Sequence, residues 1–418
     1  MQQRNYIMSK IKIRNFGPIK EGYNENEGWM DIKKVTVFIG NQGSGKSTVA
    51  KLISVFTKIE KSLVRGDFEK NIFESKNRLK SYYLPYHRLE DYLNDNSEID
   101  YIGDKYSIVY RNETLSINEI QNSKYSLPQI MYVPAERNFL AYIKGAEELK
   151  LSSEALQEFS TEYYKAMQEM NGDPLLLPIN NTEIRYDKRS DELYLKSTNY
   201  RIKLSVASSG FQSFVPLYLV SNNLANSVKQ QSGKKSAMSS EETVKFQKGL
   251  RTIWDNDHLT EIQKRQAISE LASAFNKIAF INIVEEPEQN LFPSSQQKML
   301  NSLLEINNMN EDNKLILTTH SPYLINFLSI SIEGESLKNK LSESKSSNDL
   351  LAKLDNIVPV KSLIAANDAV IYQLDEINGV IRKLLAPEGV PSDANYLNDM
   401  LREGNRLFDS LLEIEEEL

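Results

Sequence analysis

Short, continuous apolar runs recur along this chain between longer polar segments. The runs at 35–40, 129–134, 277–286 and 314–320 predict strands that are buried on both faces of a sheet. Apolar and polar residues alternate at 10–19, 101–117 and 182–206, which predicts strands with one solvated face. Helical patterns fill about 46–94, part of 151–170 and most of 222–275. Strands interleaved with helices predict an α/β fold.

The same pattern divides the chain into a main unit and an extension. We expect residues 1–340 to form the main unit, interrupted by mostly helical insertions at about 60–128 and 222–275. The Ser-, Gln- and Lys-rich stretch 226–240 predicts a mobile loop within the second insertion. After a linker at 342–349, a hairpin at 369–385 and a C-terminal helix are expected to pack on the main unit as an extension, 341–418.

Composition narrows the class of protein. The chain has 418 residues, 40% hydrophobic and 26% charged, which is typical of globular domains with a sizeable core. It has no cysteine, which excludes disulfides and thiolate metal sites. No apolar run is long enough to span a bilayer and the first residues lack a secretory signal, so we expect a cytoplasmic protein without membrane contact. A net charge of −7 argues against a broadly basic nucleic-acid binder, although 50 Lys and Arg leave room for a local basic groove.

One glycine-rich segment carries a specific chemical signal. "GNQGSGKST" at 40–48 follows an apolar run, begins a helical pattern and fits the consensus G-x-x-x-x-G-K-[ST]. Its backbone N–H groups and its lysine are suited to the phosphates of ATP, and the hydroxyl after the lysine to Mg²⁺. The expected ATP contacts are Gly40, Asn41, Gln42, Gly43, Ser44, Gly45, Lys46, Ser47 and Thr48, with Ser47 also a metal ligand. The alternative is a Gly/Ser linker that matches by chance, which the flanking strand and helix disfavour.

A pair of carboxylates ends the apolar run 277–286. Because parallel strands end at one edge of a sheet, Glu285 is expected beside the phosphates, where it would orient the Mg²⁺ shell. Glu286 would hold the attacking water and accept its proton. The plainer alternative is a strand that ends in a solvated acidic turn.

Two further segments suggest additional phosphate contacts. His320 ends another apolar run just before a predicted helix, where a histidine can donate to a γ-phosphate; a purely structural histidine is the alternative. In "SVASSGFQSFVPLYLV", Ser208, Ser209 and Gly210 interrupt a strand pattern and an apolar helix follows at once. A helix start with free N–H groups binds anions, so this segment could hold the γ-phosphate bound to a second copy in an ATP-sandwich dimer.

The order of these motifs resembles the ABC-type ATPases. "KIKIRNFGPI", "EEPEQNLFP" and "LTTHSPYLI" resemble the RecF, SMC and OLD-like branch, and "VPAERNFL" and "ASSGFQSFVPL" resemble stand-alone ATPases of bacterial anti-phage modules such as Septu. The resemblance covers the ATPase core and leaves out the helical insertions. It implies a P-loop NTPase fold of ABC type, in which a mixed sheet with helices is joined by an antiparallel β subdomain. It also implies a homodimer or higher homo-oligomer and a protein effector encoded nearby.

The sequence departs from the ABC pattern at several positions. Glu285 stands where ABC proteins usually have Asp, which implies slow turnover. "ASSGFQ" replaces Leu-Ser-Gly-Gly-Gln, so the contact to a second copy's nucleotide falls on the Ser-Ser-Gly segment, with Gln212 as a further candidate. The glutamine of the Q-loop has no clear position, and Gln121 and Gln129 are the candidates.

Three other features leave alternatives open. "WDNDHLTEIQ" offers Asp255, Asp257 and His258 as metal ligands, but Thr260 and Gln263 also fit a helix-capping box. Arg137 in "VPAERNFL" either touches nucleotide or braces a strand. The residues after His320 contain no pattern of the TOPRIM nuclease domain that follows the ATPase in OLD proteins.

These expectations favour an ATP-driven switch that controls a partner effector, a nuclease or toxin, in anti-phage defence. The alternative is a RecF-like DNA-binding ATPase of DNA repair, although no long coiled coil or basic arm is visible. An autonomous nuclease would need metal-binding carboxylates outside the ATP site. A transporter ATPase is disfavoured by the forms of the motifs.

Overall fold

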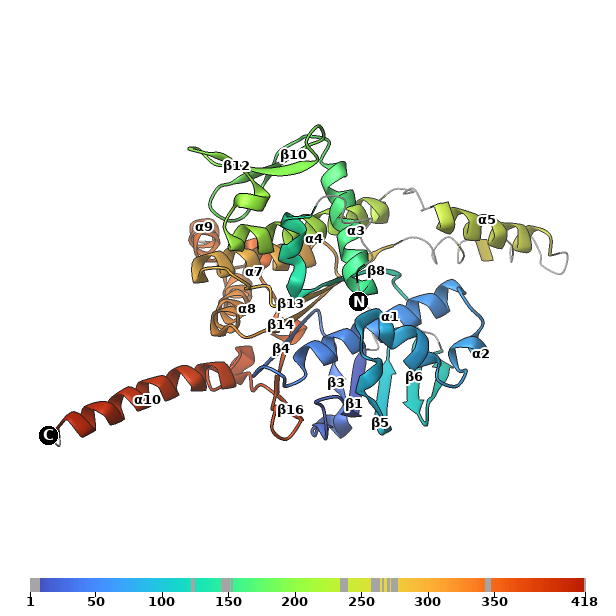
Figure 1. The fold of residues 1–418 in the computed structure, drawn as a ribbon, viewed down its shortest axis with the longest axis horizontal. Coiled ribbons are helices and arrows are strands. Elements are labelled where there is room, and N and C mark those ends of the chain that lie inside the picture. Colours follow the sequence, from blue (N-terminus) through green and yellow to red (C-terminus); the bar gives the residue numbers. More distant parts are fainter. Residues whose placement is uncertain are drawn as a thin grey trace.

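The computed structural model describes residues 8–121, 125–143, 151, 153–233, 240–256, 264, 267, 268, 271, 277–342 and 347–416. Within these residues the strands form three sheets. The helices are α1 (Lys46–Arg65), α2 (Lys70–Phe73), α3 (Glu154–Glu169), α4 (Ser209–Gly233), α5 (Ser240–Trp254), α7 (Pro293–Asn307), α8 (Pro322–Ser342), α9 (Ser347–Ile357) and α10 (Tyr396–Glu416). The body of the molecule is layered, and α5 and α10 extend away from it (Figure 1).

A seven-stranded sheet forms the centre, in the order β2-β16-β15-β4-β14-β13-β8. Its strands are β2 (Gly22–Tyr23), β16 (Val380–Lys383), β15 (Ala369–Leu374), β4 (Val35–Gly40), β14 (Lys314–Thr319), β13 (Ala279–Glu285) and β8 (Pro128–Val133). The five strands from β15 to β8 are parallel, and β16 turns back antiparallel to β15. Every residue of β4 and β13 is buried, which explains their continuous apolar sequences.

Two antiparallel sheets complete the β structure. The first has the order β3-β1-β5-β6-β7, with β1 (Lys10–Phe16), β3 (Met30–Asp31), β5 (Leu93–Ile102), β6 (Tyr106–Arg111) and β7 (Thr114–Glu119). The second has the order β12-β11-β10-β9, with β9 (Leu175–Leu176), β10 (Glu183–Asp187), β11 (Glu192–Lys196) and β12 (Arg201–Lys203). The predicted fold class, a mixed sheet with helices plus an antiparallel β subdomain, is therefore confirmed.

Two hydrophobic clusters cover the faces of the central sheet. On one face α1 packs between this sheet and the first antiparallel sheet, where Val49 and Phe56 of α1 join one cluster with Ile13 of β1. On the other face α3, α4, α7 and α8 contribute apolar side chains such as Phe159, Phe214 and Leu303. The helix that follows the glycine-rich segment is thus held between two sheets, and its first turn lies at a fixed edge of the central one.

A buried carboxylate joins α1 to the first antiparallel sheet. Glu60 Oε1 accepts hydrogen bonds from the backbone N–H groups of Lys105 (2.7 Å) and Tyr106 (3.0 Å). The Tyr101 hydroxyl donates to Glu60 Oε2 (3.2 Å). Burial raises the pKa of Glu60 to about 7. Ionisation of this group near neutral pH therefore places a buried charge between α1 and the first antiparallel sheet, which weakens their contact.

Three expectations about the chain's organisation are wrong. Residues 60–128 are not mostly helical, because β5, β6, β7 and the first residue of β8 occupy much of them and the helical pieces after α1 are single turns. The predicted loop at 226–240 is helical at 226–233, as part of α4, while 234–239 lie outside the described residues. The predicted boundary after residue 340 does not separate an extension, because β15 pairs with β4 inside the central sheet.

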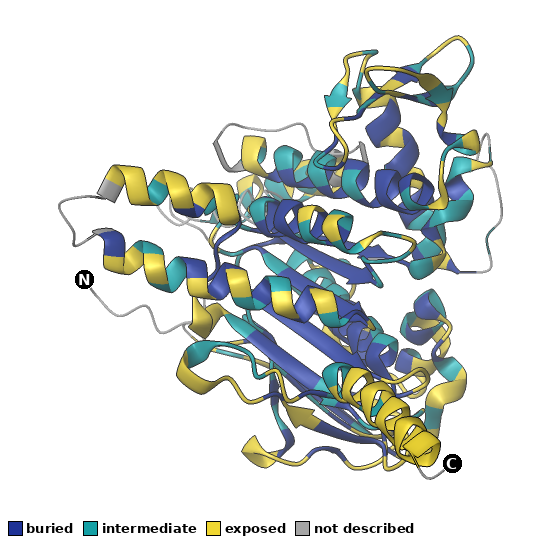
Figure 2. Ribbon diagram, turned by 90° about the vertical axis from the view of Figure 1, so that its left-hand side faces the viewer, coloured by how far each residue is buried: buried dark blue, intermediate teal, exposed yellow. Residues whose placement is uncertain are grey.

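The C-terminal part behaves in two different ways. The predicted hairpin at 369–385 is present as β15 and β16. The predicted last helix is present as α10, and its first turn packs on the body, where Leu397 lies against the larger core cluster. Beyond that turn the surface of α10 is exposed along most of its length (Figure 2). No helix in the described parts of the chain combines the length and apolarity needed to cross a membrane.

Candidate functional site

The register of three adjacent parallel strands brings the predicted motifs together. Ile39, next to the last residue of β4, pairs with Thr319 at the end of β14. Thr318 in turn pairs with Glu285, the last residue of β13. The glycine-rich loop after β4, His320 after β14 and the Glu pair at the end of β13 therefore emerge side by side at one edge of the sheet. Ligands of open α/β sheets bind outside the carboxyl ends of the strands, at an edge of this kind.

The loop at 40–45 has a backbone that glycine permits. Gly40 has φ 148°, and a Cβ atom there would lie 2.4 Å from the Leu374 carbonyl oxygen of the neighbouring strand. Gly45 has φ 99° and forms the N-cap of α1 without a side-chain hydrogen bond to the helix. Because the first turn of a helix has no internal acceptors for its N–H groups, the N-terminus of α1 presents donors and positive potential toward this loop.

Lys46 folds back over the loop that precedes it. Its Nζ donates to the carbonyl oxygens of Gly40 (3.0 Å) and Asn41 (2.7 Å), and only 5% of the residue is exposed. Burial lowers the pKa of Lys46 to about 8, and the nearby carboxylates of Glu286 and Glu288 oppose this shift. An anion at this position would restore the full charge of the ammonium group.

The remaining residues of the loop divide into an exposed rim and a buried base. Asn41, Gln42 and Gly43 are exposed, and Asn41 Nδ2 donates to Glu376 Oε1 (2.8 Å). Ser44 is buried and its Oγ has no hydrogen-bond partner. Ser47 is half-buried, and Thr48 is buried. The orphaned hydroxyl of Ser44 beneath the loop is a polar group that a bound anion or water could satisfy.

Glu285 lies buried at the end of β13, in the position predicted for a metal-orienting carboxylate. The backbone N–H of Ala135 donates to its Oε2 (3.3 Å), and Lys51 Nζ lies 3.8 Å from its Oε1. That Oε1 atom has no hydrogen-bond partner. A buried carboxylate oxygen without a hydrogen bond, beside Lys51 one helical turn after Ser47, fits the oxygen donors that Mg²⁺ prefers. Ser47 and Glu285 would hold the ion, directly or through its water shell.

Glu286 has a strained backbone and faces His320. Its φ is 42°, a left-handed value that non-glycine residues rarely adopt. Its Oε1 lies 3.6 Å from His320 Nε2, and both side chains are partly open to solvent. Burial and the Lys46 cation lower the pKa of His320, so its imidazole is neutral at pH 7 and can donate or accept one hydrogen bond. Strain at a carboxylate beside a phosphate loop is typical of a site under functional constraint.

Arg137 holds the backbone of the two glutamates in place. It lies in the 3-10 helical segment Ala135–Ala141 after β8 and is fully buried. Its guanidinium donates to the carbonyl oxygens of Glu285 (2.7 Å) and Glu286 (2.7 Å). It also donates to Pro134 O and Ser213 O, both at 3.0 Å. All four acceptors are main-chain atoms, which supports the bracing alternative over direct contact with nucleotide.

Two carboxylates at this edge were not predicted as site residues. Glu288 Oε1 accepts from the Thr319 hydroxyl and from the His320 backbone N–H, both at 2.8 Å, and so ties the loop after β13 to the end of β14. Burial raises the pKa of Glu288. Glu376 reaches the loop from the end of β15. Glu288 stands within the "EEPE" motif, which was a usable signal, whereas nothing in the sequence places the strand of Glu376 beside β4.

The Ser-Ser-Gly segment begins a helix, as predicted. α4 starts at Ser209, and the side chains of Ser208 and Ser209 are exposed. Gly210 packs closely on the loop after Glu286, because a Cβ atom there would lie 2.8 Å from the Asn290 carbonyl oxygen. Gln212 is turned inward: its Nε2 donates to the carbonyls of Ser205 (3.1 Å) and Ala207 (3.0 Å). In this conformation Gln212 stabilises its own loop, and its predicted contact with nucleotide would require it to release those bonds.

Other predicted residues lie away from this edge. Gln129 pairs with Phe280, five residues before Glu285, so it is separated from the site by roughly 16 Å of strand. Gln121 follows β7 in the first antiparallel sheet. Neither candidate for the Q-loop glutamine is brought to the loop. Asp255 follows α5, while Asp257, His258, Thr260 and Gln263 lie outside the described residues. Among the residues that are described, no cluster of three potential metal ligands is found.

Comparison with known proteins gives one family match and several distant structural likenesses. Residues 260–325 match the model of the AAA ATPase domain, a segment that contains β13, the glutamate pair, β14 and His320. No curated protein matches the chain. The SMC head domain from Thermotoga maritima is similar with a TM-score of 0.36 and 10% identity, over 91% of this chain and 98% of that one. An ATP-binding cassette in a dimeric post-hydrolysis state bound to ADP and phosphate is similar with a TM-score of 0.29 and 13% identity, over 91% and 100% of the two chains.

Proposed function

We propose that this chain is a Mg²⁺-dependent ATPase in which bound ATP joins two copies. The observation that carries the proposal is the convergence of Lys46, Glu286 and His320 at the carboxyl ends of adjacent parallel strands. The AAA ATPase match supports it, because the matched segment includes two of these three residues. A solvated acidic turn does not account for a strained Glu286 that faces a histidine beside a buried lysine.

Each residue has a role that follows from its position. Lys46 would exchange its two carbonyl acceptors for phosphate oxygens, which are stronger acceptors because they carry charge. Glu286 would accept a proton from the attacking water, and neutral His320 would donate to the terminal phosphate. Ser47 and Glu285 would hold Mg²⁺. Bound Mg²⁺ would neutralise negative charge on the phosphate oxygens.

The second half of the nucleotide site would come from another copy of the chain. Ser208 and Ser209 are exposed at the start of α4, where free N–H groups suit an anion. Gly210 contacts the loop after Glu286, so this helix start and the loop of the catalytic carboxylate share one face. Two large apolar side chains flank them in an exposed position: Phe292 is 75% exposed and Val206 is 69% exposed. Exposed apolar residues beside an incomplete anion site are consistent with an interface between copies.

We further propose that the ATP-bound state is passed to a partner effector through α5, in a cytoplasmic anti-phage system as the sequence resemblance implies. Lys245 of α5 forms an ion pair with Asp67 (2.8 Å), which also lies 3.5 Å from Arg65 at the end of α1. α1 begins at the phosphate loop and ends just before Asp67, so this one helix links the nucleotide to the ion pair with Lys245 of α5. A partner docked on α5 would therefore respond to movement of α1.

The proposal is tested by nucleotide binding and hydrolysis. Lys46→Ala should lose ATP binding in titration calorimetry, and Glu286→Gln should retain binding but lose at least a hundredfold in phosphate release. Lys340→Ala and Glu333→Gln, both at exposed positions of α8, are the matched controls. Normal ATP binding by Lys46→Ala would refute the nucleotide site, and normal turnover by Glu286→Gln would reassign the base.

The interface between copies has its own test. Ser208→Arg should abolish hydrolysis without preventing ATP binding, because the bulk is placed at an exposed helix start and not at the chain's own phosphate loop. A mixture of Ser208→Arg and Lys46→Ala can form dimers with one intact composite site, so part of the activity should return. Hydrolysis by Ser208→Arg at the parent rate would rule out this segment as part of the site.

A further inference from the structure

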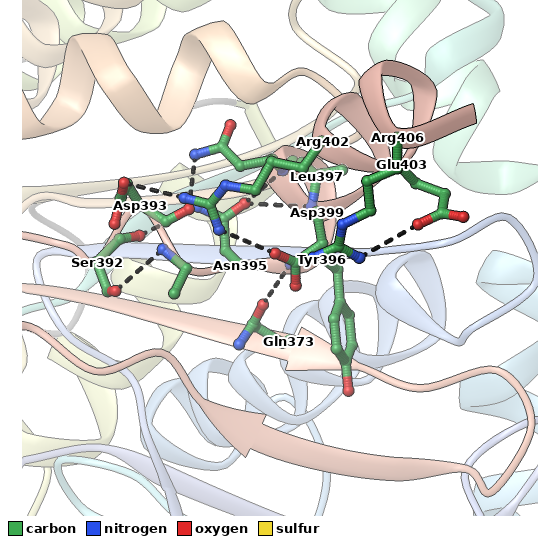
Figure 3. Close-up of polar contacts among 12 residues, drawn as sticks. Gln373, Ser392, Asp393, Asn395, Tyr396, Leu397, Asp399, Arg402, Glu403 and Arg406 are labelled. Atoms are coloured by element: carbon green, nitrogen blue, oxygen red, sulfur yellow. Dashed lines mark hydrogen bonds and ion pairs between the residues drawn. The ribbon is translucent and has the colours of Figure 1, made fainter. Parts of the chain in front are cut away.

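The last helix is fixed at its first turns and projects from there. Asn395 caps it, because its Oδ1 accepts from the backbone N–H groups of Leu397 and Asn398, both at 3.1 Å. The Tyr396 N–H donates to Gln373 Oε1 (2.9 Å), which ties the helix start to β15 (Figure 3). This anchor gives α10 a defined direction away from the body (Figure 1).

Arginines on the polar side strengthen this anchor. Arg402 donates to Asp393 Oδ2 (3.0 Å) and to Asp399 Oδ1 (3.1 Å), one turn earlier (Figure 3). Arg406 donates to Glu403 Oε2 (3.3 Å). These ion pairs occupy the face of the helix that is already polar. On the opposite face Leu397 packs against the larger core cluster, and the large apolar side chains from Met400 onward are exposed.

That opposite face is a continuous apolar stripe. Positions 397, 400, 404, 407, 411 and 414 follow one another at alternating spacings of three and four residues, which places them on one side of a helix. Leu401, Phe408 and Leu412 widen the stripe. From residue 400 onward the large apolar side chains of the stripe are between 42% and 69% exposed. A capped helix with such a face buries it against another surface in the functional state.

We propose that this face pairs antiparallel with α10 of a second copy of the chain. The apolar positions are nearly symmetric about Leu407, which is the requirement of an isologous two-fold interface. When Leu407 meets its own copy, Met400 of one helix faces Ile414 of the other, and Leu401 faces Leu412. These large apolar side chains therefore meet one another across the interface.

Gly404 is explained by the same arrangement. It lies mid-helix on the apolar stripe, where glycine is about 1 kcal/mol less favourable than alanine, and apart from the helix's own backbone no atom of the described chain lies within 4 Å of the position its Cβ would occupy. In the symmetric register, Gly404 of one copy faces Leu411 of the other. The missing side chain makes room for that leucine, so the two helices can approach closely.

Charge selects the antiparallel direction. The first half of α10 balances Asp399 and Glu403 against Arg402 and Arg406. The second half, from Asp409, carries acidic residues only. A parallel pair would place two acidic halves together, whereas an antiparallel pair places each acidic half beside the half that contains the arginines. The acidic composition also makes the pairing sensitive to like-charge repulsion if the register slips.

This pairing is independent of the proposed nucleotide site, and it would hold two copies together without ATP. Two copies so tethered would meet through their nucleotide faces at a raised effective concentration. If the two interfaces join different pairs of chains, closed symmetry would produce a tetramer.

Sedimentation velocity of the full chain without nucleotide tests the proposal. The parent should sediment as a dimer at micromolar concentration, and so should Lys46→Ala, because ATP is not required. Leu411→Glu should sediment as a monomer. Ser410→Glu, which adds the same charge one residue away on the polar face, should remain a dimer. A monomeric parent would overturn the proposal and leave a partner of different sequence as the occupant, and a dimeric Leu411→Glu would show that the copies pair elsewhere.

Cysteine cross-linking tests the direction. The chain has no cysteine, so an introduced pair reports without background. Under mild oxidation, the double variant Met400→Cys/Ile414→Cys should form covalent dimers, and Ile414→Cys alone should not. Cross-linking of Ile414→Cys alone, as efficient as that of the double variant, would establish a parallel pair and overturn the antiparallel arrangement. Circular dichroism of each variant checks that α10 and the body remain folded.

Discussion

Replacement of Arg137 by methionine should destabilise the chain more than the same replacement of a surface arginine. Met has a similar reach and fills the space of the side-chain stem, so the substitution mainly removes the charge and the donors. The guanidinium is fully buried and donates to four main-chain carbonyls, of Pro134, Ser213, Glu285 and Glu286. It therefore joins three segments of chain: the end of β8, the start of α4 and the end of β13.

The magnitude follows from these bonds. Hydrogen bonds from a charged donor contribute roughly 1.5–3 kcal/mol each, and desolvation of the buried cation offsets a large part of the sum. Burial lowers the pKa of Arg137 to about 10, so the group still carries its charge at pH 7. The parent chain therefore bears the cost of desolvating this cation, and the variant does not. We expect a net loss of about 4 kcal/mol, which is the usual range when one partner of a buried charged network is removed.

Equilibrium urea unfolding, followed by far-UV circular dichroism, measures this loss. Arg402→Met is the matched control, because Arg402 forms hydrogen bonds to two carboxylates and its side chain is 46% exposed. Exposed ion pairs contribute less than about 1 kcal/mol, so the control should unfold near the parent. Arg137→Met should also slow ATP hydrolysis more than it weakens ATP binding, because Glu286 loses the bond that helps hold its strained backbone.

Two results would refute this reasoning. A loss below about 1 kcal/mol for Arg137→Met would mean that water or neighbouring groups satisfy the carbonyls as well as the guanidinium does. A large loss of ATP binding at unchanged stability would mean that Arg137 contacts nucleotide, which is the alternative that the observed geometry disfavours.

Three further predictions concern ionisation and packing. Folding raises the pKa of Glu60 from 4.5 to about 7, so between these values the folded chain keeps a proton that the unfolded chain releases. The free energy of unfolding should therefore fall by about 3 kcal/mol as pH rises through this window. Urea unfolding at pH 5 and pH 8 measures this fall, and Glu60→Gln should remove it. Burial lowers the pKa of Lys46 to about 8, so ATP binding at pH 8.5 should take up a fraction of a proton; titration calorimetry in two buffers of different ionisation enthalpy detects it, and equal heats would contradict it. Gly210→Ala places a Cβ atom 2.8 Å from the Asn290 carbonyl oxygen, so it should displace the loop after Glu286 and slow hydrolysis; a parent rate for Gly210→Ala would show that the loop yields freely.

Local sequence was sufficient for the phosphate loop and its neighbours. Three glycines and a lysine in nine residues allow few backbone conformations, and the observed positive φ at Gly40, Gly43 and Gly45 is the conformation that this spacing predicts. The continuous apolar runs predicted buried strands, and parallel strands must end at a common edge. The position of Glu285, Glu286 and His320 at that edge follows from these two facts alone.

Interactions between distant segments were beyond the reach of the pattern. The region 60–128 has mixed apolar spacing, and pairing of β5 with β1 decides that much of it is strand. The hairpin at 369–385 was predicted, but only its hydrogen bonds to β4 place it inside the central sheet and bring Glu376 to Asn41. Gln212 is a candidate nucleotide contact in sequence, and the fold adds what the sequence did not show: its amide donates to the carbonyls of its own loop.

The sequence by itself determined which residues can do phosphate chemistry, and the tertiary structure decided which of them are held, strained or left open. Main-chain carbonyls are present at every position and carry no sequence signal. The hydrogen bonds from Arg137 to the carbonyl oxygens of the glutamate pair could therefore not be predicted from the sequence. For α10 the division is reversed: the amphipathic pattern is visible in the sequence, but only the fold shows that its apolar face stays uncovered within the described part of one chain. Burial is a property of the whole packing arrangement, because a local pattern specifies which face is apolar and not what will cover it.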